Sequence, residues 1–128
     1  MLAELSEDAA TGIIAEIYGE IRRLWAVPYV SSLQRHLATR PGWLEWSWSA
    51  LGPAFQSGAA QTAGWRLAAD LDFPRLAPMD AADLDVDPAG LQTIRDVCAS
   101  FVRVAPVNLI FAGLLRRLMN GERPAGGG

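Results

Sequence analysis

Apolar residues recur at spacings of three and four along most of the chain, which places them on one face of a helix. In residues 6–25 this stripe includes Ile17, Ile21 and Leu24, with Ser6 as the expected N-cap. No segment alternates between apolar and polar residues with hairpin turns at its ends. The pattern therefore predicts an all-α protein of about six helices in one domain.

Prolines and glycines divide the rest of this helical pattern. Asp87 is the expected N-cap of the fifth helix and Pro106 the first residue of the sixth, because proline fits the first turn of a helix but breaks its interior. Residues 72–87 combine prolines with aspartates and are predicted to cross the surface without forming a strand. The further helices are expected over residues 30–40, 42–51, 57–71 (with Ser57 as N-cap), 88–105 and 106–120.

The same spacing predicts which side chains are buried. Cys98 is expected to act as a small buried hydrophobic residue, and the tryptophans as core and interface residues. The expected buried stripes consist of Leu44, Trp48 and Leu51 in the third helix, Leu91, Ile94, Cys98 and Phe101 in the fifth, and Ile110, Leu114 and Leu118 in the sixth.

Composition and charge exclude several classes of partner and of site. The chain has 128 residues, expected as one helical domain over residues 1–121 and a disordered glycine-rich tail over 122–128. Its 11 basic residues are all arginine and are outnumbered by 14 acidic ones, so nucleic acid is not an expected partner. One cysteine and one histidine exclude an internal disulfide and a cysteine-rich zinc site, and no metal or other cofactor is expected. The start lacks the features of a signal peptide, and the longest apolar run, near VNLIFAGLL, is about half of a membrane span, so a cytoplasmic protein without a membrane partner is expected.

A few polar residues are candidates for chemistry. Ser32 and His36 lie four residues apart on one helix face, where a hydroxyl and an imidazole could touch. Asn108 lies inside an apolar run, so its amide either bridges two helices or lines a pocket. Arg35 and Arg103 could each clamp a substrate carboxylate with two hydrogen bonds, although a solvated surface position is the commoner arrangement.

The stretch EIYGEIRRLWAVPYVSSLQRHLATRPGWLEWSWSAL contains, in this order, IY-x-x-IR, a Val-Pro helix entry, LAT-x-PG and a tryptophan-rich helix, and a second stretch is FVRVAPVNLIFAGLLRRL. The first resembles the group I 2-haloacid dehalogenase family, which keeps this order, and the second is similar to the F-N-x-x-NP-x-x-LL segment of that family. The resemblance implies an all-helical fold built from two repeats, of which this chain has the length of one. A homodimer that imitates the fused molecule is therefore expected. Trp43, Trp46, Val107 and Phe111 would supply its apolar contact area.

The resemblance also implies a reaction, in which an Asp-activated water attacks C2 of a small 2-haloacid and releases halide. The family's Asp falls at Leu33 in this chain, and its Asn falls at Ala105. Tyr29 and Ser32 carry over as substrate-binding candidates beside Arg35 and Asn108.

Three residues after Leu33, His36 becomes the candidate base, since its unperturbed pKa is near neutrality. The alternative is a non-catalytic homodimeric helical protein that kept the fold but lost the catalytic Asp and Asn.

Overall fold

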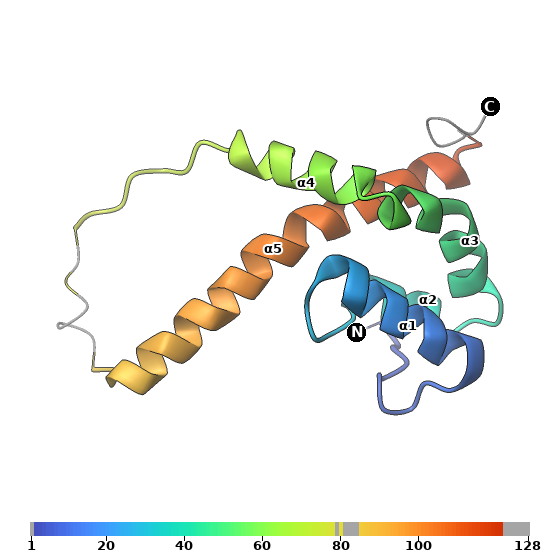
Figure 1. Cartoon of the computed structure of the whole chain (residues 1–128), viewed down its shortest axis with the longest axis horizontal. Helices are drawn as coiled ribbons and strands as arrows, with labels where there is room; N and C mark the ends of the chain where they lie inside the picture. The colour runs from blue at the N-terminus through green and yellow to red at the C-terminus, as the bar shows by residue number, and fades with distance from the viewer. Residues whose placement is uncertain (1, 79, 81–84, 122–128) are drawn as a thin grey trace.

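The computed structural model describes residues 2–78, 80 and 85–121, and over those ranges it contains five helices and no strand. The all-α prediction is confirmed. The predicted tail over residues 122–128 and part of the predicted surface crossing lie outside the described residues. The helices are α1 (Gly12–Trp25), α2 (Ser32–Leu37), α3 (Trp43–Gln56), α4 (Ala59–Ala69) and α5 (Pro88–Met119) (Figure 1).

Local sequence explains where some of these helices begin. The Asp87 side chain accepts a hydrogen bond from the Gly90 N–H at 2.6 Å, which confirms the predicted cap of α5. The predicted cap at Ser6 is wrong, because its hydroxyl closes an isolated turn by accepting from the Ala9 N–H at 3.2 Å. The predicted cap of α4 at Ser57 is also wrong. The N-cap is Gly58, whose positive φ of 83° suits glycine.

The predicted helix boundary at Pro106 is wrong. Helix α5 runs for 32 residues with Pro106 inside it, so two predicted helices form one. A proline removes a helical hydrogen bond, but here α4 packs closely on the affected turn. A Cβ added at Gly64 would lie 2.8 Å from the Pro106 carbonyl oxygen, and Trp65 Nε1 donates to the Arg103 carbonyl at 3.0 Å. These tertiary contacts hold α5 together across its weakest point.

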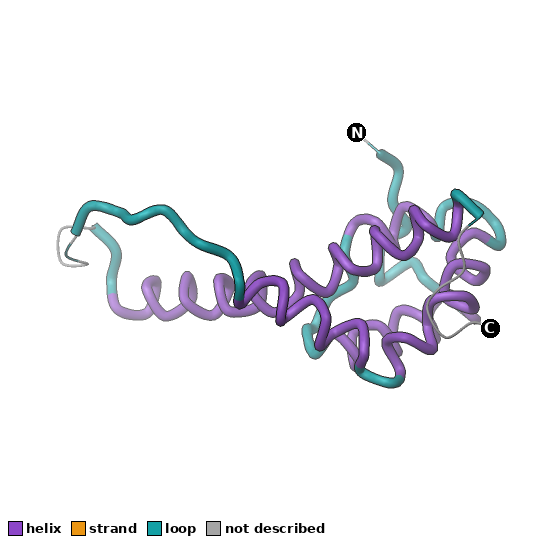
Figure 2. Tube along the Cα trace, turned by 90° about the horizontal axis from the view of Figure 1, so that it is seen from above, coloured by secondary structure: helices purple, strands orange, loops and turns teal. Residues whose placement is uncertain are grey.

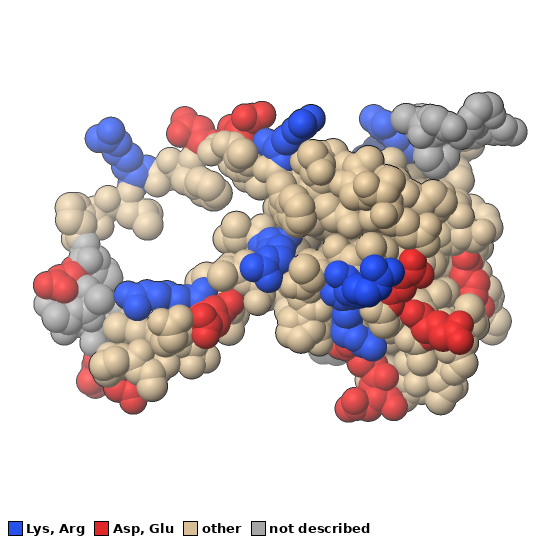
Figure 3. Space-filling view, viewed as in Figure 1, with Lys and Arg blue, Asp and Glu red and all other residues tan. Residues whose placement is uncertain are grey.

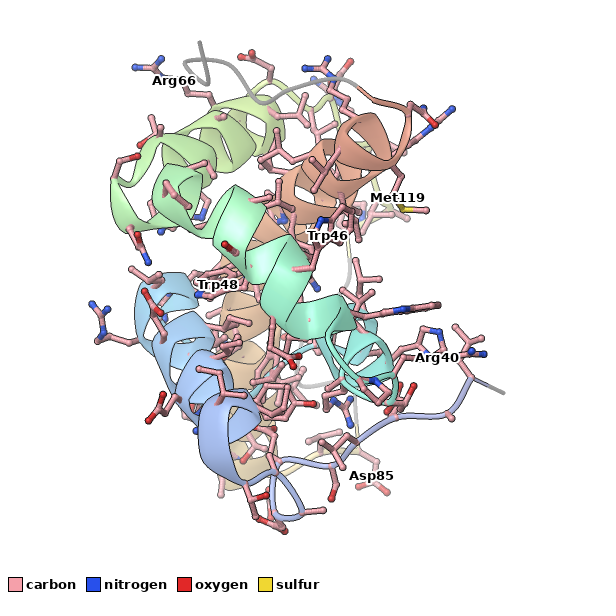
Figure 4. The ribbon with its side chains drawn as sticks, turned by 90° about the vertical axis from the view of Figure 1, so that its right-hand side faces the viewer. Arg40, Trp46, Trp48, Arg66, Asp85 and Met119 are labelled. Carbon is pink, nitrogen blue, oxygen red and sulfur yellow. The ribbon has the colours of Figure 1, made fainter. Side chains whose placement is uncertain are left out.

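An aromatic cluster forms the centre of the core, between α1, α3 and the second half of α5. The Trp25 ring stacks on Phe55 with 4.4 Å between ring centroids, and Phe111 lies 5.8 Å from Phe55. The predicted burial of Trp48 is confirmed, and its indole Nε1 donates to Glu20 of α1 at 3.1 Å. In Figure 4, Trp48 lies on the α1 side of α3, whereas Trp46 lies on the side of Met119. The predicted partners of Trp48 on this stripe, Leu44 and Leu51, are also fully buried.

The first half of α5 projects away from the rest of the molecule (Figures 1 and 2). The predicted burial of its apolar stripe is therefore wrong: Ile94 is 51% exposed, Phe101 is 61% exposed, and Cys98 is exposed. No residue of α5 before Val104 belongs to the hydrophobic core of the described chain. Helical spacing gave the apolar side correctly, but nothing in the described chain covers it.

In the second half of α5, the structure contradicts part of the expected dimer contact. Val107 and Phe111, expected to face a second copy, are fully buried in the core of their own chain. Of that expected contact set, Trp43 and Trp46 remain about half exposed. Joining the two predicted helices also makes α5 long and apolar enough, by length and composition alone, to cross a membrane. Only 17% of the most apolar stretch of this helix is buried within the described chain.

Candidate functional site

A pocket of about 560 Å³ lies between the start of α2 and the middle of α5. The connection after α1 supplies one wall, and the first turn of α2 supplies the next. Two turns of α5 around Pro106 form the opposite wall. The lining residues are Tyr29, Val30, Ser31, Ser32, Leu33, Arg35, Phe101, Val104, Ala105 and Asn108.

The structure brings together most of the site residues expected from the sequence. The four substrate-binding candidates, Tyr29, Ser32, Arg35 and Asn108, all line this pocket. So do the two positions that the family resemblance assigns to its Asp and Asn, which are occupied here by leucine and alanine. The segments that follow Pro28 and surround Pro106 therefore face each other across one cavity.

Arg35 is held in place at the pocket by three contacts. Its Nε donates to the Val30 carbonyl at 3.0 Å, and one terminal nitrogen donates to the Ser32 hydroxyl at 3.3 Å. The other terminal nitrogen forms an ion pair with Glu4 at 3.0 Å. The guanidinium is thus fixed beside the cavity, but the Glu4 carboxylate offsets part of its charge.

Asn108 joins the pocket to the helix interface behind it. Its Oδ1 accepts a hydrogen bond from Gln34 Nε2 at 2.9 Å, which links α5 to α2. The sequence left a helix bridge and a pocket-lining role open for Asn108, and the structure shows both. Gln34 itself was missed, although it precedes Leu37 by three residues and lies on the same buried face of α2.

Tyr29 contributes a second polar group. Its hydroxyl is buried and has no hydrogen-bond partner within the described chain. A buried hydroxyl without a partner is costly, and a bound molecule with a polar atom could remove that cost. Because this oxygen has almost no exposed surface, a molecule in the pocket could reach it only after the side chains that cover it move.

His36 and Arg103, two further candidates, lie outside the pocket lining. His36 Nδ1 is 2.7 Å from the Ala3 carbonyl oxygen, so the N-terminal segment occupies this ring atom. Arg103 donates instead to the Ala26 carbonyl at 3.0 Å. The Ser32–His36 pair does not form either: the Ser32 hydroxyl accepts from Arg35, and His36 Nδ1 contacts the Ala3 carbonyl. His36 therefore does not line this pocket.

The composition of the lining determines what the pocket can do. It offers hydroxyl, amide and guanidinium donors beside apolar side chains, and none of its ten described lining residues is Asp, Glu or His. Such a site can hold a small anion with an apolar body, but it lacks a side chain that accepts a proton near neutral pH. Within the described residues, no group of three or more His, Cys, Asp and Glu side chains is placed to hold a metal.

Charged side chains are more frequent elsewhere on the surface. Figure 3 shows acidic and basic groups gathered together over the face formed by α1. One of the ion pairs there joins Arg22 to Glu7 at 2.6 Å. Because this surface over α1 carries both signs of charge, it does not favour the binding of an anion, unlike the pocket lining, which has no acidic residue among those described.

Comparison with known proteins gives consistent results in sequence and in structure. No protein-family profile matches the chain. An (R)-2-haloacid dehalogenase of Pseudomonas putida is 29% identical over 77 residues, which cover 60% of this chain and 24% of that protein.

Three solved structures share the fold. They are a D-2-haloacid dehalogenase mutant, its complex with D-2-CPA, and a D-2-haloacid dehalogenase complex with L-LA. Each has a TM-score of 0.67 and 18% identity to this chain and covers 91% of it. The chain spans only 42% of the first of these structures, which is less than half of its length.

Proposed function

We propose that this chain, which is related to the 2-haloacid dehalogenases, is a dehalogenase-type hydrolase whose pocket between α2 and α5 takes a small 2-haloacid. The observation that carries the proposal is the meeting of Tyr29, Ser32, Arg35 and Asn108 in one cavity. Those residues supply hydrogen-bond donors for a carboxylate, and the apolar side chains around them suit a short carbon chain.

Hydrolysis at C2 sets a clear chemical requirement. The water oxygen bonds to C2 as the carbon–halogen bond breaks, halide leaves, and the proton of the water passes to a base. That base must lie within hydrogen-bond reach of the water. Leu33 and Ala105 cannot accept the proton, and the described pocket lining contains no other suitable group.

This observation favours a second candidate function, in which the pocket binds a small carboxylate without turning it over. The two candidates share the same ligand chemistry. They differ only in whether a base reaches the bound molecule. The first candidate therefore requires a base from outside the described pocket lining.

Halide release from racemic 2-chloropropionate tests the first candidate, with equilibrium binding of the same acid measured in parallel. Release together with binding supports a hydrolase. Binding without release supports the carboxylate-binding protein, and absence of both contradicts the pocket as a functional site. His36→Ala serves as the control, because its ring lies outside the pocket lining and the variant should behave as the parent in both assays.

We also propose that two copies form the working unit. The first half of α5 exposes a continuous apolar face, and a soluble monomer seldom leaves a patch of this kind uncovered. The chain spans 42% of a structural neighbour of the same fold, so a second copy could occupy the place of the remaining part. The exposed residues of this face are Ile94, Val97, Cys98, Phe101 and Val102.

A further inference from the structure

We propose that Gln34 is a positioning residue: it holds the carboxamide of Asn108 so that the Asn108 NH₂ faces the pocket and donates to an oxygen of the bound carboxylate. The inference deepens the proposed function and rests on it. Gln34 does not line the pocket and acts only through its neighbour.

The direction of one hydrogen bond carries the argument. Gln34 Nε2 donates to Asn108 Oδ1 at 2.9 Å, so the oxygen of the Asn108 amide points toward α2. The nitrogen of a carboxamide lies on the opposite side of the same planar group and carries two N–H donors. Asn108 lines the cavity, and its nitrogen is absent from the buried polar atoms that lack a partner. The accessible end of this amide is therefore its donor end.

Core packing does not explain an amide at position 34. Gln34 is fully buried, and its Oε1 has no hydrogen-bond partner among the described residues. A buried polar atom without a partner lowers stability, whereas leucine would fill a similar volume without that cost. The hydrogen bond that Gln34 does make is the one that orients Asn108. The energetic cost of burying the Gln34 amide is therefore consistent with a role in the site.

The other lining residues indicate which kind of ligand the Asn108 NH₂ would bind in the pocket. Arg35 and Ser32 add donors on the facing wall, and Glu4, which lies outside the described lining, already pairs with one terminal nitrogen of Arg35. The remaining donors favour a ligand with acceptor oxygens, while Leu33 and Val104 favour a short apolar body. A small carboxylate meets both conditions, and a small amide meets them less well because its NH₂ would oppose that of Asn108.

Two variants of Gln34 test this role through the choice of ligand. Gln34→Leu frees the Asn108 carboxamide to rotate, and binding of 2-chloropropionate should weaken at least tenfold. Gln34→Glu replaces the donor by an acceptor, so the Asn108 NH₂ should turn toward α2 and its Oδ1 toward the pocket. Carboxylate binding should then be lost, while propanamide, which can donate to Oδ1, should bind more tightly than to the parent. A merely structural residue would not reverse this preference.

Gln61 supplies a matched control. It is also a buried glutamine with an unpartnered Oε1, and its Nε2 donates to the Phe55 carbonyl at 2.8 Å, away from the pocket. Gln61→Leu should therefore change stability without changing the dissociation constant of either ligand. Dissociation constants are measured by titration calorimetry, and the side-chain NH₂ signals of Asn108 are followed by NMR during the same titrations.

Each outcome supports or overturns the inference. Failure of the parent chain to bind 2-chloropropionate overturns the proposed function and this inference together. Binding by the parent that both Gln34 variants retain within twofold overturns the inference alone. If either variant does not fold, hydrogen exchange of the Gln34 NH₂ in the parent decides: protection supports its bond to Asn108, and exchange at the solvent rate contradicts it.

Discussion

Two apolar side chains, Leu33 and Ala105, determine at the scale of single residues which chemistry the pocket can perform. Both line the cavity, at the positions where the family resemblance places an acid and an amide. Neither can activate water, so the proposed hydrolysis requires a base from outside the described pocket lining.

The double variant Leu33→Asp with Ala105→Asn restores both groups in the existing cavity. It should create or raise halide release from 2-chloropropionate, since the introduced carboxylate would lie among the donors that hold the acid. A partly buried carboxylate should also lower the free energy of unfolding by a few kcal/mol, roughly the cost of an unpaired polar group. A folded double variant that binds the acid and releases no halide would contradict this expectation.

Tyr18 provides a pH-dependent test of the packing of the N-terminal segment. Burial raises the pKa of its phenol above 10.0, and its hydroxyl donates to the Leu5 carbonyl at 2.9 Å. The folded state therefore holds this proton more tightly than the unfolded state, so its stability contribution is complete below about pH 10 and is lost as pH rises through the folded pKa. Denaturant unfolding between pH 8 and pH 11 should show a steeper loss of stability for the parent than for Tyr18→Phe. Equal slopes would show that the phenol is not buried in solution.

At the scale of elements, the crossing of α4 and α5 explains why a proline inside α5 is tolerated. The two helices approach so closely at Gly64 and Pro106 that no side chain fits between their backbones. The sequence shows a glycine and a proline far apart and gives no sign that they meet. Their contact is a property of the packed helices.

Gly64→Ala should therefore destabilise the protein, although alanine is the better helix former. The added Cβ would lie 2.8 Å from the Pro106 carbonyl oxygen and 3.1 Å from the Val107 nitrogen, so two backbones must separate. We expect a loss of about 1–3 kcal/mol, the usual cost of overpacking. Gly113→Ala in α5 is the control, because nothing lies within 4 Å of its added Cβ, and it should gain about 0.5–1 kcal/mol. Thermal or denaturant unfolding that ranks the two variants in the other order would contradict the crossing.

Trp48 tests the packing of α3 against α1. Its ring is 6% exposed, lies 5.8 Å from Trp25 between centroids, and donates to Glu20. Trp48→Ala should cost about 3–5 kcal/mol, as is typical for removing a large buried aromatic side chain. Trp46→Ala on the same helix should cost much less, since Trp46 is 50% exposed. Similar melting temperatures for the two variants would show that the helix is rotated from its described orientation.

At the scale of the whole molecule, the first half of α5 projects and exposes apolar side chains. Its apolar side chains have no cover in the described chain, and the structures of the same fold are more than twice as long as this chain. Chains of this size can bury such a face by pairing with a copy of themselves. The pocket opens beside this half of α5, since Phe101 belongs to both.

Sedimentation should accordingly show a dimer of twice 13.8 kDa at micromolar concentration. Val102→Glu places a charge on the exposed face and should shift the protein to monomers without unfolding it, because Val102 makes no core contact and is 70% exposed. Ile13→Glu adds the same charge at an exposed site on α1 and should leave the dimer intact. A parent chain that stays monomeric, or that floats with lipid vesicles instead, would contradict pairing of two copies.

Local sequence by itself determined the helical class, the cap of α5 at Asp87 and the stripe that buries Trp48, because helical spacing and capping act within a few residues. Local sequence singled out Arg35 and Asn108 and the family resemblance added Tyr29 and Ser32, and the structure brings these four residues together in one pocket. Tertiary structure decided what lies against each stripe, and this separated Phe111 in the core from Phe101 at the surface of the same helix. It also placed His36 outside the pocket and Gln34 behind Asn108. Periodicity determines which side of a helix is apolar, but only the packed chain determines which neighbour, if any, covers it.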